Sequence, residues 1–350
     1  MTDPTFTILL PVHRPPAMLP FAINSVLAQE RRDFELFVIC DGAPPETASC
    51  AQEFAARDSR IHVFVHPKGE GKGEAYRHQA LQQARGSYVC QIGDDDLWLP
   101  NHLSEIALLL RDVDFGNLSH IEALVDGRVI LLSGDASDPA IRQRMTSELF
   151  NFFGQTVWGY RLSAYRSLPL GWSPAPLGLP SDINMIRKFF AQEGLRFGTR
   201  VGVTTVKFAA YYRRAWSLEQ RAAEVKEWVA RVADPAGRDA IVQMGLGDMN
   251  RRAYALQVGS AVLQGQVNSL QAQNAELRAQ YAQLQAKPTA QAGEKDAATA
   301  SAAVQAELQQ HLRGRAHQVK KLRHRITAIK RTWSWRLTRP LRRLARALGR

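Results

Sequence analysis

Short apolar runs alternate with helix-like segments over the first hundred residues of the chain. The runs are continuously apolar or nearly so, as in strands that are buried on both faces of a parallel sheet. Between them, apolar residues at spacings of three and four indicate amphipathic helices, the first over about 15–29. This rhythm predicts an α/β fold in which helices cover the sheet. The predicted strands are Phe6–Leu10, Leu36–Cys40, Ile61–Val65 and Tyr88–Ile92.

Beyond residue 215 the pattern becomes purely helical. Leucines recur every seven residues, at Leu256, Leu263, Leu270, Leu277 and Leu284, with Val267, Asn274 and Tyr281 between them. This is the pattern of a coiled coil, in which a single Asn in the apolar seam commonly sets the register. A second run with spacings of three and four extends from Leu308 to Trp333. The two segments could pair as a hairpin within one chain, or each could join a partner chain; we favour self-association into a homo-oligomer.

These changes of pattern divide the chain into six segments. We expect, in order, the first half of an α/β domain, its second half, a helical extension, a coiled-coil helix, a linker and a basic helical tail: 1–105, 106–215, 216–254, 255–286, 287–302 and 303–350.

Composition places the basic character of the chain in this tail. The formal charge is +12, yet residues 311–350 hold fourteen lysines and arginines and no acidic residue. The body is therefore near neutral, and its chemistry needs a separate argument from the partners of the tail. Three cysteines without a paired spacing fit a reduced, cytoplasmic setting. We expect neither a signal peptide nor a membrane-spanning helix.

Three consecutive aspartates stand directly behind the fourth predicted strand, in "VCQIGDDDLWLP" (Val89–Pro100). Adjacent carboxylates repel one another and are costly to bury unless they are paired or bound to a cation. The stretch is therefore either a solvated acidic loop that caps the next helix, or a site for a divalent metal that carries an anion. Asp41 also follows a strand. Because ligands of parallel sheets bind outside the carboxyl ends of the strands, this shared placement favours a site.

Three stretches carry a specific resemblance: "FTILLPVHRPPAMLPFAINSVLAQ", "ELFVICDGAPPET" and "GEAYRHQALQQARGSYVCQIGDDDLWLPNHL". In order and spacing they resemble the nucleotide-sugar half of a family 2 glycosyltransferase, over about residues 5–105 and more weakly to about 215. The resemblance implies a GT-A (Rossmann-like) mixed sheet with helices on both faces, ahead of the coiled coil and tail. It also implies the inverting transfer of a sugar from a nucleoside diphosphate donor to an acceptor hydroxyl, with Mn²⁺ or Mg²⁺.

The resemblance assigns the aspartates to the donor. A diphosphate leaving group needs an opposing charge, which a divalent cation on carboxylates can supply. By analogy with the family's Asp-X-Asp pattern, Asp95 is the expected metal ligand and Asp94 the expected ribose contact. Asp96 could add charge or cap the helix that starts near Pro100. Gly93 stands where the family often has its first acidic residue.

Further donor contacts follow from the same resemblance. Asp41 would bond the nucleobase, although an Asp-Gly pair also simply favours a turn. Pro11 and His13 belong to the expected base-binding loop after the first strand. Arg77 stands at the family's arginine position and could bond phosphate or base, and Lys72 in the Gly-rich loop is a second phosphate candidate. The plain alternatives are a surface arginine and an ordinary loop.

An inverting transfer also needs a general base for the acceptor hydroxyl. Asp182 is the candidate, because "LGLPSDINMIRKFF" matches the context in which relatives carry an acidic pair at a helix start. Helix capping would explain the same residue. Trp158 and Trp172 are candidates for an acceptor platform, although aromatic residues of this kind more often belong to a core.

The tail suggests where such an enzyme would work. Residues 333–350 form a basic amphipathic segment that suits an anionic membrane surface, where each basic residue contributes about 1 kcal/mol. Charge alone would also allow RNA or DNA, and a solvated tail is the plain alternative; nucleic acid is not the expected partner. Relatives often act on lipid-linked glycans. We therefore expect a peripheral enzyme on the inner face of the cytoplasmic membrane, acting in surface polysaccharide or glycolipid synthesis.

Two other functions compete with this interpretation. A catalytically silent scaffold, which binds a glycan or a partner through its coiled coil, would need no metal. A nucleotidyltransferase would use a similar sheet and metal, but it needs a basic signature loop after the first strand, and "PVHRPPAMLP" does not show one. The sequence identifies neither the sugar, nor the nucleotide, nor the acceptor.

Overall fold

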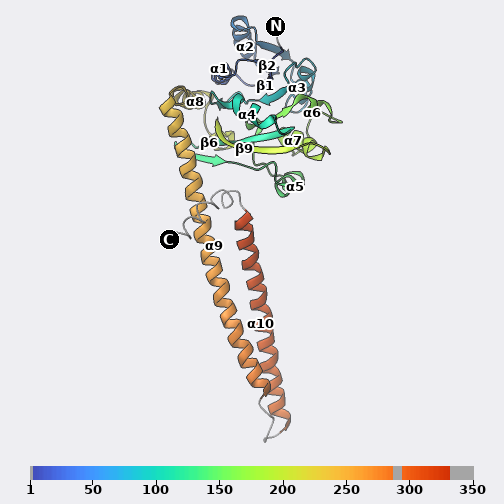
Figure 1. Ribbon diagram of the computed structural model, residues 1–350, viewed down its shortest axis with the longest axis vertical. Helices are drawn as coiled ribbons and strands as arrows, with labels where there is room; N and C mark the ends of the chain where they lie inside the picture. The colour runs from blue at the N-terminus through green and yellow to red at the C-terminus, as the bar shows by residue number, and fades with distance from the viewer. Residues whose placement is uncertain (1–2, 287–293, 332–350) are drawn as a thin grey trace. The chain divides into compact units, whose positions relative to one another are not determined.

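The computed structural model describes residues 3–286 and 294–331 and divides into two compact units, Met1–Asp248 and Met249–Arg350. The first unit holds both predicted halves of the α/β domain and most of the predicted extension 216–254 (Figure 1). The predicted linker 287–302 lies partly, and the tail segment 333–350 wholly, outside the described residues.

The first unit contains one mixed sheet of nine strands. The strand order is β3-β2-β1-β4-β8-β6-β9-β5, with β7 paired to β6. Strands β1 to β4 are parallel to one another, whereas β8 runs antiparallel to both β4 and β6. The parallel half matches the four predicted strands. The strands are β1 Phe6–Val12, β2 Phe34–Asp41, β3 Ile61–His66, β4 Tyr88–Gln91, β5 Leu97–Trp98, β6 Phe115–Ala123, β7 Val129–Leu132, β8 Trp158–Arg161 and β9 Phe197–Lys207.

Successive residues of the central strands enter two different cores. In β1, Ile8 and Leu10 join one cluster, with residues of α1, α2 and α4, while Leu9 joins the other, with residues of α3, α6 and α7. This alternation is the period of a strand covered on both sides. The predicted α/β class, a mixed sheet with helices on both faces, is confirmed. The helices of this unit are α1 Leu19–Leu27, α2 Pro45–Arg57, α3 Glu74–Leu81, α4 His102–Leu110, α5 Pro139–Ser147, α6 Leu162–Arg166, α7 Ser181–Ala191 and α8 Leu218–Ala233, with the short turns η1 Gln155–Val157 and η2 Ala210–Arg213.

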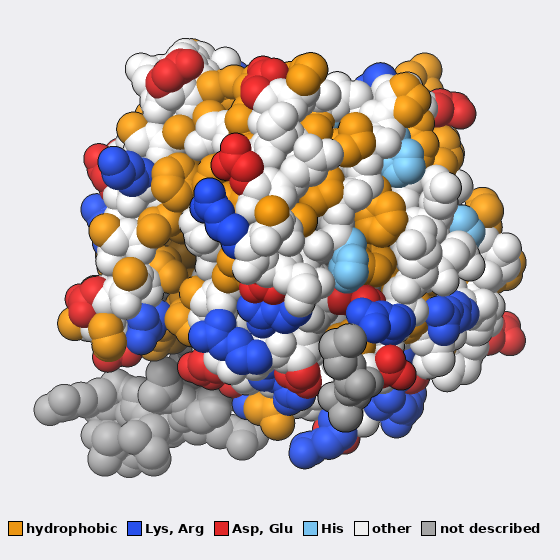
Figure 2. Space-filling view, turned by 90° about the horizontal axis from the view of Figure 1, so that it is seen from above, with side chains coloured by type: hydrophobic (Ala, Val, Ile, Leu, Met, Phe, Trp, Pro, Cys, Tyr) orange, Lys and Arg blue, Asp and Glu red, His pale blue; other side chains and the backbone are white. Residues whose placement is uncertain are grey.

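The parallel pairing brings three strand ends to one edge of the sheet. Strand β1 ends at Val12, β2 at Asp41 and β4 at Gln91, three residues before the aspartates. Pro11 lies inside β1, opposite Ile39, and not in the following loop as the sequence suggested, so that loop begins at His13. Seen from above in Figure 2, Lys and Arg side chains gather in the lower part of the face, among acidic and apolar ones.

Helix α9 (Pro235–Ala286) begins in the first unit and continues into the second, where it pairs with α10 (Glu294–Arg331). Leu263 and Val267 of α9 form a small core with Ile326 of α10, and Gln309 Nε2 donates a 2.9 Å hydrogen bond to the hydroxyl of Tyr281. The hairpin alternative is thus the one that the structure has. Self-association of this hairpin stays a prediction. Within the described residues, none of the helices is both long and apolar enough to cross a lipid bilayer.

Candidate active site

The three aspartates after β4 are largely buried, and each is paired with a cation. The side chains of Asp94, Asp95 and Asp96 are 6%, 14% and 5% exposed. Arg14, in the loop after β1, bridges the first two: its Nη2 lies 2.7 Å from Asp94 Oδ1, and its Nη1 lies 3.2 Å from Asp95 Oδ2. Burial and the neighbouring Asp95 both raise the pKa of Asp94, which the charge of Arg14 opposes.

Asp95 receives a second cation from far along the chain. Arg221 Nη2, on α8, lies 2.6 Å from the same Oδ2 atom. Helix α8 is fixed at its start by a capping box between Ser217 and Gln220, and it buries Val225 and Trp228. The other carboxylate oxygen of Asp95 has no protein hydrogen-bond partner among the described residues.

Asp96 is bonded into the protein interior. Lys207 Nζ, at the end of β9, lies 3.0 Å from Asp96 Oδ2, the backbone N–H of Phe208 donates to Oδ1, and the hydroxyl of Thr156 also donates. Burial by itself raises the pKa of Asp96, but Lys207 and these hydrogen bonds outweigh it, so the pKa is lowered. The suggestion that Asp96 caps the following helix is wrong, because Asn101 stands at the N-cap of α4 and Asp96 is used elsewhere.

Asp41 anchors the Gly-rich loop at the same edge. Its Oδ1 accepts a 2.7 Å bond from the backbone N–H of Gly69, and its Oδ2 lies 2.5 Å from Lys68 Nζ. Gly73, at the N-cap of α3, has φ = +72°, and a Cβ there would lie 2.9 Å from the Asp41 side chain, so the close approach requires glycine.

His13 is exposed and lies in the positive field of this loop. Partial burial of the ring lowers its pKa, as do the charges of Arg14, Lys72 and Lys68, while Asp41 opposes them. The structure therefore brings His13, Asp41 and Lys72 together, as the sequence suggested. The Lys72 side chain is exposed and makes no ion pair in the described part of the chain.

Arg77 is buried at 2% exposure, so it is not the surface arginine of the plain alternative. Its Nη2 donates to the Lys72 carbonyl and to Ser181 Oγ, both at 3.0 Å, and its guanidinium lies over the Trp172 ring. Burial lowers its pKa to about 10. Arg77 thus connects the Gly-rich loop of the first half to the start of α7 in the second.

Asp182 lies in the first turn of α7 but does not cap it. Pro180 stands at the N-cap, and the Asp182 carboxylate accepts a 3.0 Å bond from Asn151 Nδ2. Burial raises the pKa of Asp182, and the charges of Lys207 and Arg77 act in the opposite direction. The same lysine therefore influences both Asp182 and Asp96.

The two tryptophans suggested as an acceptor platform lie in the interior. Trp158 is 1% exposed and packs against Phe115 and Tyr160, and Trp172 is 3% exposed beneath Arg77. Their rings serve the core, which was the alternative considered from the sequence.

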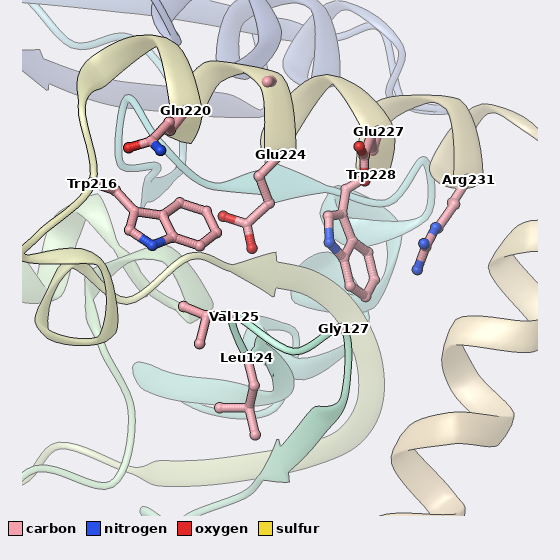
Figure 3. A pocket seen from close by; sticks show the side chains of 10 residues that line it. Leu124, Val125, Gly127, Trp216, Gln220, Glu224, Glu227, Trp228 and Arg231 are labelled. Atoms are coloured by element: carbon pink, nitrogen blue, oxygen red, sulfur yellow. The ribbon is translucent and has the colours of Figure 1, made fainter.

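A groove lined by two other tryptophans opens beside α8 (Figure 3). It has a volume of about 330 Å³ and lies between α8 and the turn that joins β6 to β7. In Figure 3 the Glu224 carboxylate points between the rings of Trp216 and Trp228. Arg213, which is buried, holds this carboxylate by a paired ionic contact. The groove is lined further by Gln220, Glu227 and Arg231.

Sequence reasoning missed every cation that pairs with the three aspartates. Arg14 carried a usable signal, since it follows His13 in the loop that was already expected to face the donor. Lys207 and Arg221 carried none, because they lie 111 and 126 residues from their partners.

The comparisons with known proteins bear on the part of the chain that holds the aspartate cluster. Residues 7–165 match the model of glycosyl transferase family 2. Over these residues the chain is similar to that family, and the match covers slightly less than half of the chain. The match ends before α7 and α8, so it includes Asp41 and the aspartate cluster but neither Asp182 nor Arg221.

Individual relatives align with a shorter part of the chain than the family model does. The chain is 31% identical over 93 residues to the uncharacterized glycosyltransferase EpsJ of Bacillus subtilis, covering 27% of this chain and 26% of that one. It is 30% identical over 113 residues to the Escherichia coli enzyme WfgD, named UDP-Glc:alpha-D-GlcNAc-diphosphoundecaprenol beta-1,3-glucosyltransferase. This alignment covers 32% of this chain and 44% of WfgD. The chain thus spans less than half the length of these relatives. Staphylococcus aureus TarS 1–349 superposes with a TM-score of 0.47 and 18% identity, over 69% of this chain and 70% of that one.

Replacement of Asp96 tests the structural role of its ion pair. Asp96→Asn leaves Lys207 largely buried without its counter-charge, so the free energy of unfolding should fall by about 3 kcal/mol at pH 7. Because the pKa of Asp96 is lowered in the folded state, the pair stabilises the protein above the ordinary value of 3.8, and this stability is lost as the pH falls through the lowered value. Denaturant unfolding of both proteins from pH 7 to pH 3 should show the difference shrinking.

Asp126→Asn is the matched control, since Asp126 forms an exposed pair with Arg128 and its replacement should lower the free energy of unfolding far less. Equal stability of the Asp96 and Asp126 variants would contradict the assignment.

Proposed function

We propose that this family 2 domain transfers a sugar from a nucleoside diphosphate-sugar to an acceptor hydroxyl with inversion at the anomeric carbon. The observation that carries the proposal is the buried, charge-paired carboxylate cluster at the strand edge that also holds Asp41. Such an edge is where an α/β sheet binds nucleotides. The family match over residues 7–165 supports this activity, and the activity of the whole chain is our inference.

Asp95 is the proposed ligand of a divalent Mn²⁺ or Mg²⁺, and Asp94 the proposed ribose contact. The donor set fits such an ion in its chemistry, because these cations prefer carboxylate oxygens and one oxygen of Asp95 has no protein partner among the described residues. No three His, Cys, Asp or Glu side chains within the described residues converge as a closed metal site. Phosphate oxygens and water would therefore complete the shell. When bound, the ion would offset the charge that develops on the leaving diphosphate.

The nucleotide would lie over the loops that follow β1 and β2. Asp41 is proposed to accept a hydrogen bond from the base, beside Pro11 and His13. Lys72 offers a free charge to the phosphates. Arg77 is buried, so its proposed role is indirect: its bond to the Lys72 carbonyl positions Lys72.

Asp182 is the proposed general base. It is buried near the positive charge of Lys207, in the half of the domain that faces the donor residues. A raised pKa increases the basicity of the carboxylate that accepts the proton from the acceptor hydroxyl.

The groove of Figure 3 is the proposed acceptor surface. Indole faces pack on the apolar faces of sugar rings, and fixed polar groups such as Glu224 and Gln220 can bond their hydroxyls. A lipid-linked glycan is the proposed acceptor class, because WfgD is named for an acceptor on diphosphoundecaprenol. The chain would then act in surface polysaccharide synthesis at the inner face of the cytoplasmic membrane, with 333–350 contacting anionic lipid.

Donor binding tests the function directly. We expect one of UDP, GDP or dTDP to raise the melting temperature in the presence of Mn²⁺, since a ligand at 100 times its Kd stabilises by about 2.7 kcal/mol. Asp95→Asn should lose the metal-dependent part of this shift, while Asp126→Asn should keep it. Hydrolysis of the matching nucleotide-sugar would exclude a silent scaffold. A full, metal-independent shift in Asp95→Asn would contradict the proposed metal ligand.

The base assignment predicts an opposite change in activity and stability. Asp182→Asn should abolish transfer and yet leave the free energy of unfolding at pH 7 equal or higher. Since the pKa of Asp182 is raised in the folded state, folding binds protons, and the wild-type protein loses stability as the pH rises from 3.8 through the raised value. Asparagine removes this cost. Transfer assays and denaturant unfolding at pH 7 and pH 3 check both parts, and unchanged transfer would show that another group is the base.

If the groove binds the acceptor, loss of a lining tryptophan should lower the rate of transfer and leave hydrolysis of the donor unchanged. Trp216→Ala should lower kcat/KM for a sugar-diphosphate lipid acceptor by about tenfold, the effect of losing one aromatic contact of about 1.4 kcal/mol. Hydrolysis of the donor should not change. Leu108→Ala, which trims an exposed apolar side chain on α4, is the control and should affect neither rate. An equal loss of both rates in Trp216→Ala would indicate a structural role instead.

A further inference from the structure

Asp95 carries two guanidinium groups on one oxygen atom, and the closer one comes from α8. Arg221 Nη2 lies 2.6 Å from Asp95 Oδ2, against 3.2 Å for Arg14 Nη1. The side chains of Arg221 and Asp95 are only 12% and 14% exposed. Short, charge-assisted bonds that are shielded from water are the strong ones among ion pairs.

The three cations differ in how firmly they are held. Lys207 is committed to Asp96, whose other oxygen is already bonded to Phe208. Arg14 bonds Asp94 as well as Asp95, and its backbone carbonyl accepts a bond from Thr47. Arg221 has Asp95 as its one hydrogen-bonding partner in the described part of the chain, whereas the Nε atoms of both arginines are buried without a partner. Of the two arginines on Asp95, Arg221 is therefore the one with a single carboxylate contact to lose.

With all three aspartates ionised, the formal charges of the cluster sum to zero. Asp94, Asp95 and Asp96 are balanced by Arg14, Lys207 and Arg221. A divalent cation alone would add two positive charges to this balanced set, whereas a cation that arrives with a diphosphate brings its own counter-charge. The metal and the nucleotide should consequently bind with positive coupling.

We propose that Arg221 is the resident counter-cation of Asp95 and competes with the divalent cation for this carboxylate. Binding of the metal together with the diphosphate displaces Arg221 from Asp95. Arg221 is thus a positioning residue: it holds Asp95 in place while the donor is absent. The inference rests on the proposed metal-dependent function, and the family match gives Arg221 no role because the match ends at residue 165.

Direct measurement of Mn²⁺ binding tests the competition without an activity assay. Free Mn²⁺ is titrated by its paramagnetic resonance signal into the full chain, first alone and then with UDP or GDP. Arg221→Gln should bind Mn²⁺ alone about tenfold more tightly than the wild type, the effect of removing one positive charge that lies beside the Asp95 carboxylate and repels the ion. The enhancement by the nucleotide should shrink by a similar factor.

Matched variants separate this effect from a general change in charge. Lys226→Gln removes one positive charge from an exposed position of the same helix and should bind Mn²⁺ like the wild type. Arg221→Lys keeps the charge and should remain close to the wild type. In an Asp95→Asn background, Arg221→Gln should no longer change Mn²⁺ affinity. The melting temperature of each variant verifies folding, and Arg221→Met, which also removes the charge, repeats the test if Arg221→Gln unfolds.

The possible results distinguish this inference from the proposed function. If Mn²⁺ and nucleotide bind together but Arg221→Gln binds Mn²⁺ as the wild type does, the competition is refuted and the function stands. Weaker Mn²⁺ binding in Arg221→Gln would also refute it, because Arg221 would then support the ion. If neither Mn²⁺ nor any nucleotide binds to any variant, the function and the inference fail together.

Discussion

Three adjacent carboxylates can stay ionised inside a protein only if positive charge is brought to them, and this requirement shapes the first unit. The three cations come from the loop after β1, from the end of β9 and from α8. None of these segments is near the aspartates in sequence. The Arg14 pairs form within the parallel first half, whereas those of Lys207 and Arg221 form only when the second half of the sheet and the following helix have closed over it.

The aspartates of this cluster differ in role: Asp96 is structural, and Asp95 is the proposed metal ligand. Asp96 has both oxygens bonded and a lowered pKa, so its charge serves the closure of the sheet. Asp95 keeps one oxygen without a protein partner in the described residues and lies beside a cation that can leave. Arg77 makes an analogous connection on the other side of the edge, where it bonds Ser181 and supports the loop at Lys72. Stability and the proposed donor binding thus depend on neighbouring side chains.

Local pattern was sufficient for the parallel half of the fold and for the acidic edge. Apolar runs revealed β1 to β4, and parallel pairing then required Asp41 and the aspartates to share an edge. Distant partners could not be found in this way, because the pairing of Arg221 with Asp95 depends on tertiary closure. Residue type also failed to separate Trp158, which is buried, from Trp216, which lines a groove. Both are aromatic residues near polar ones, and only the fold decides which face meets solvent.

Helix α8 gives a physical reason to count the segment after the family match as part of the catalytic unit. One turn of this helix supplies Arg221 to the donor edge, while Gln220, Glu224 and Trp228 line the groove. Coupling between two sites needs a shared element whose position both of them bias. Helix α8 meets this requirement for the two proposed surfaces, because it carries both the proposed counter-cation of Asp95 and residues of the proposed acceptor groove.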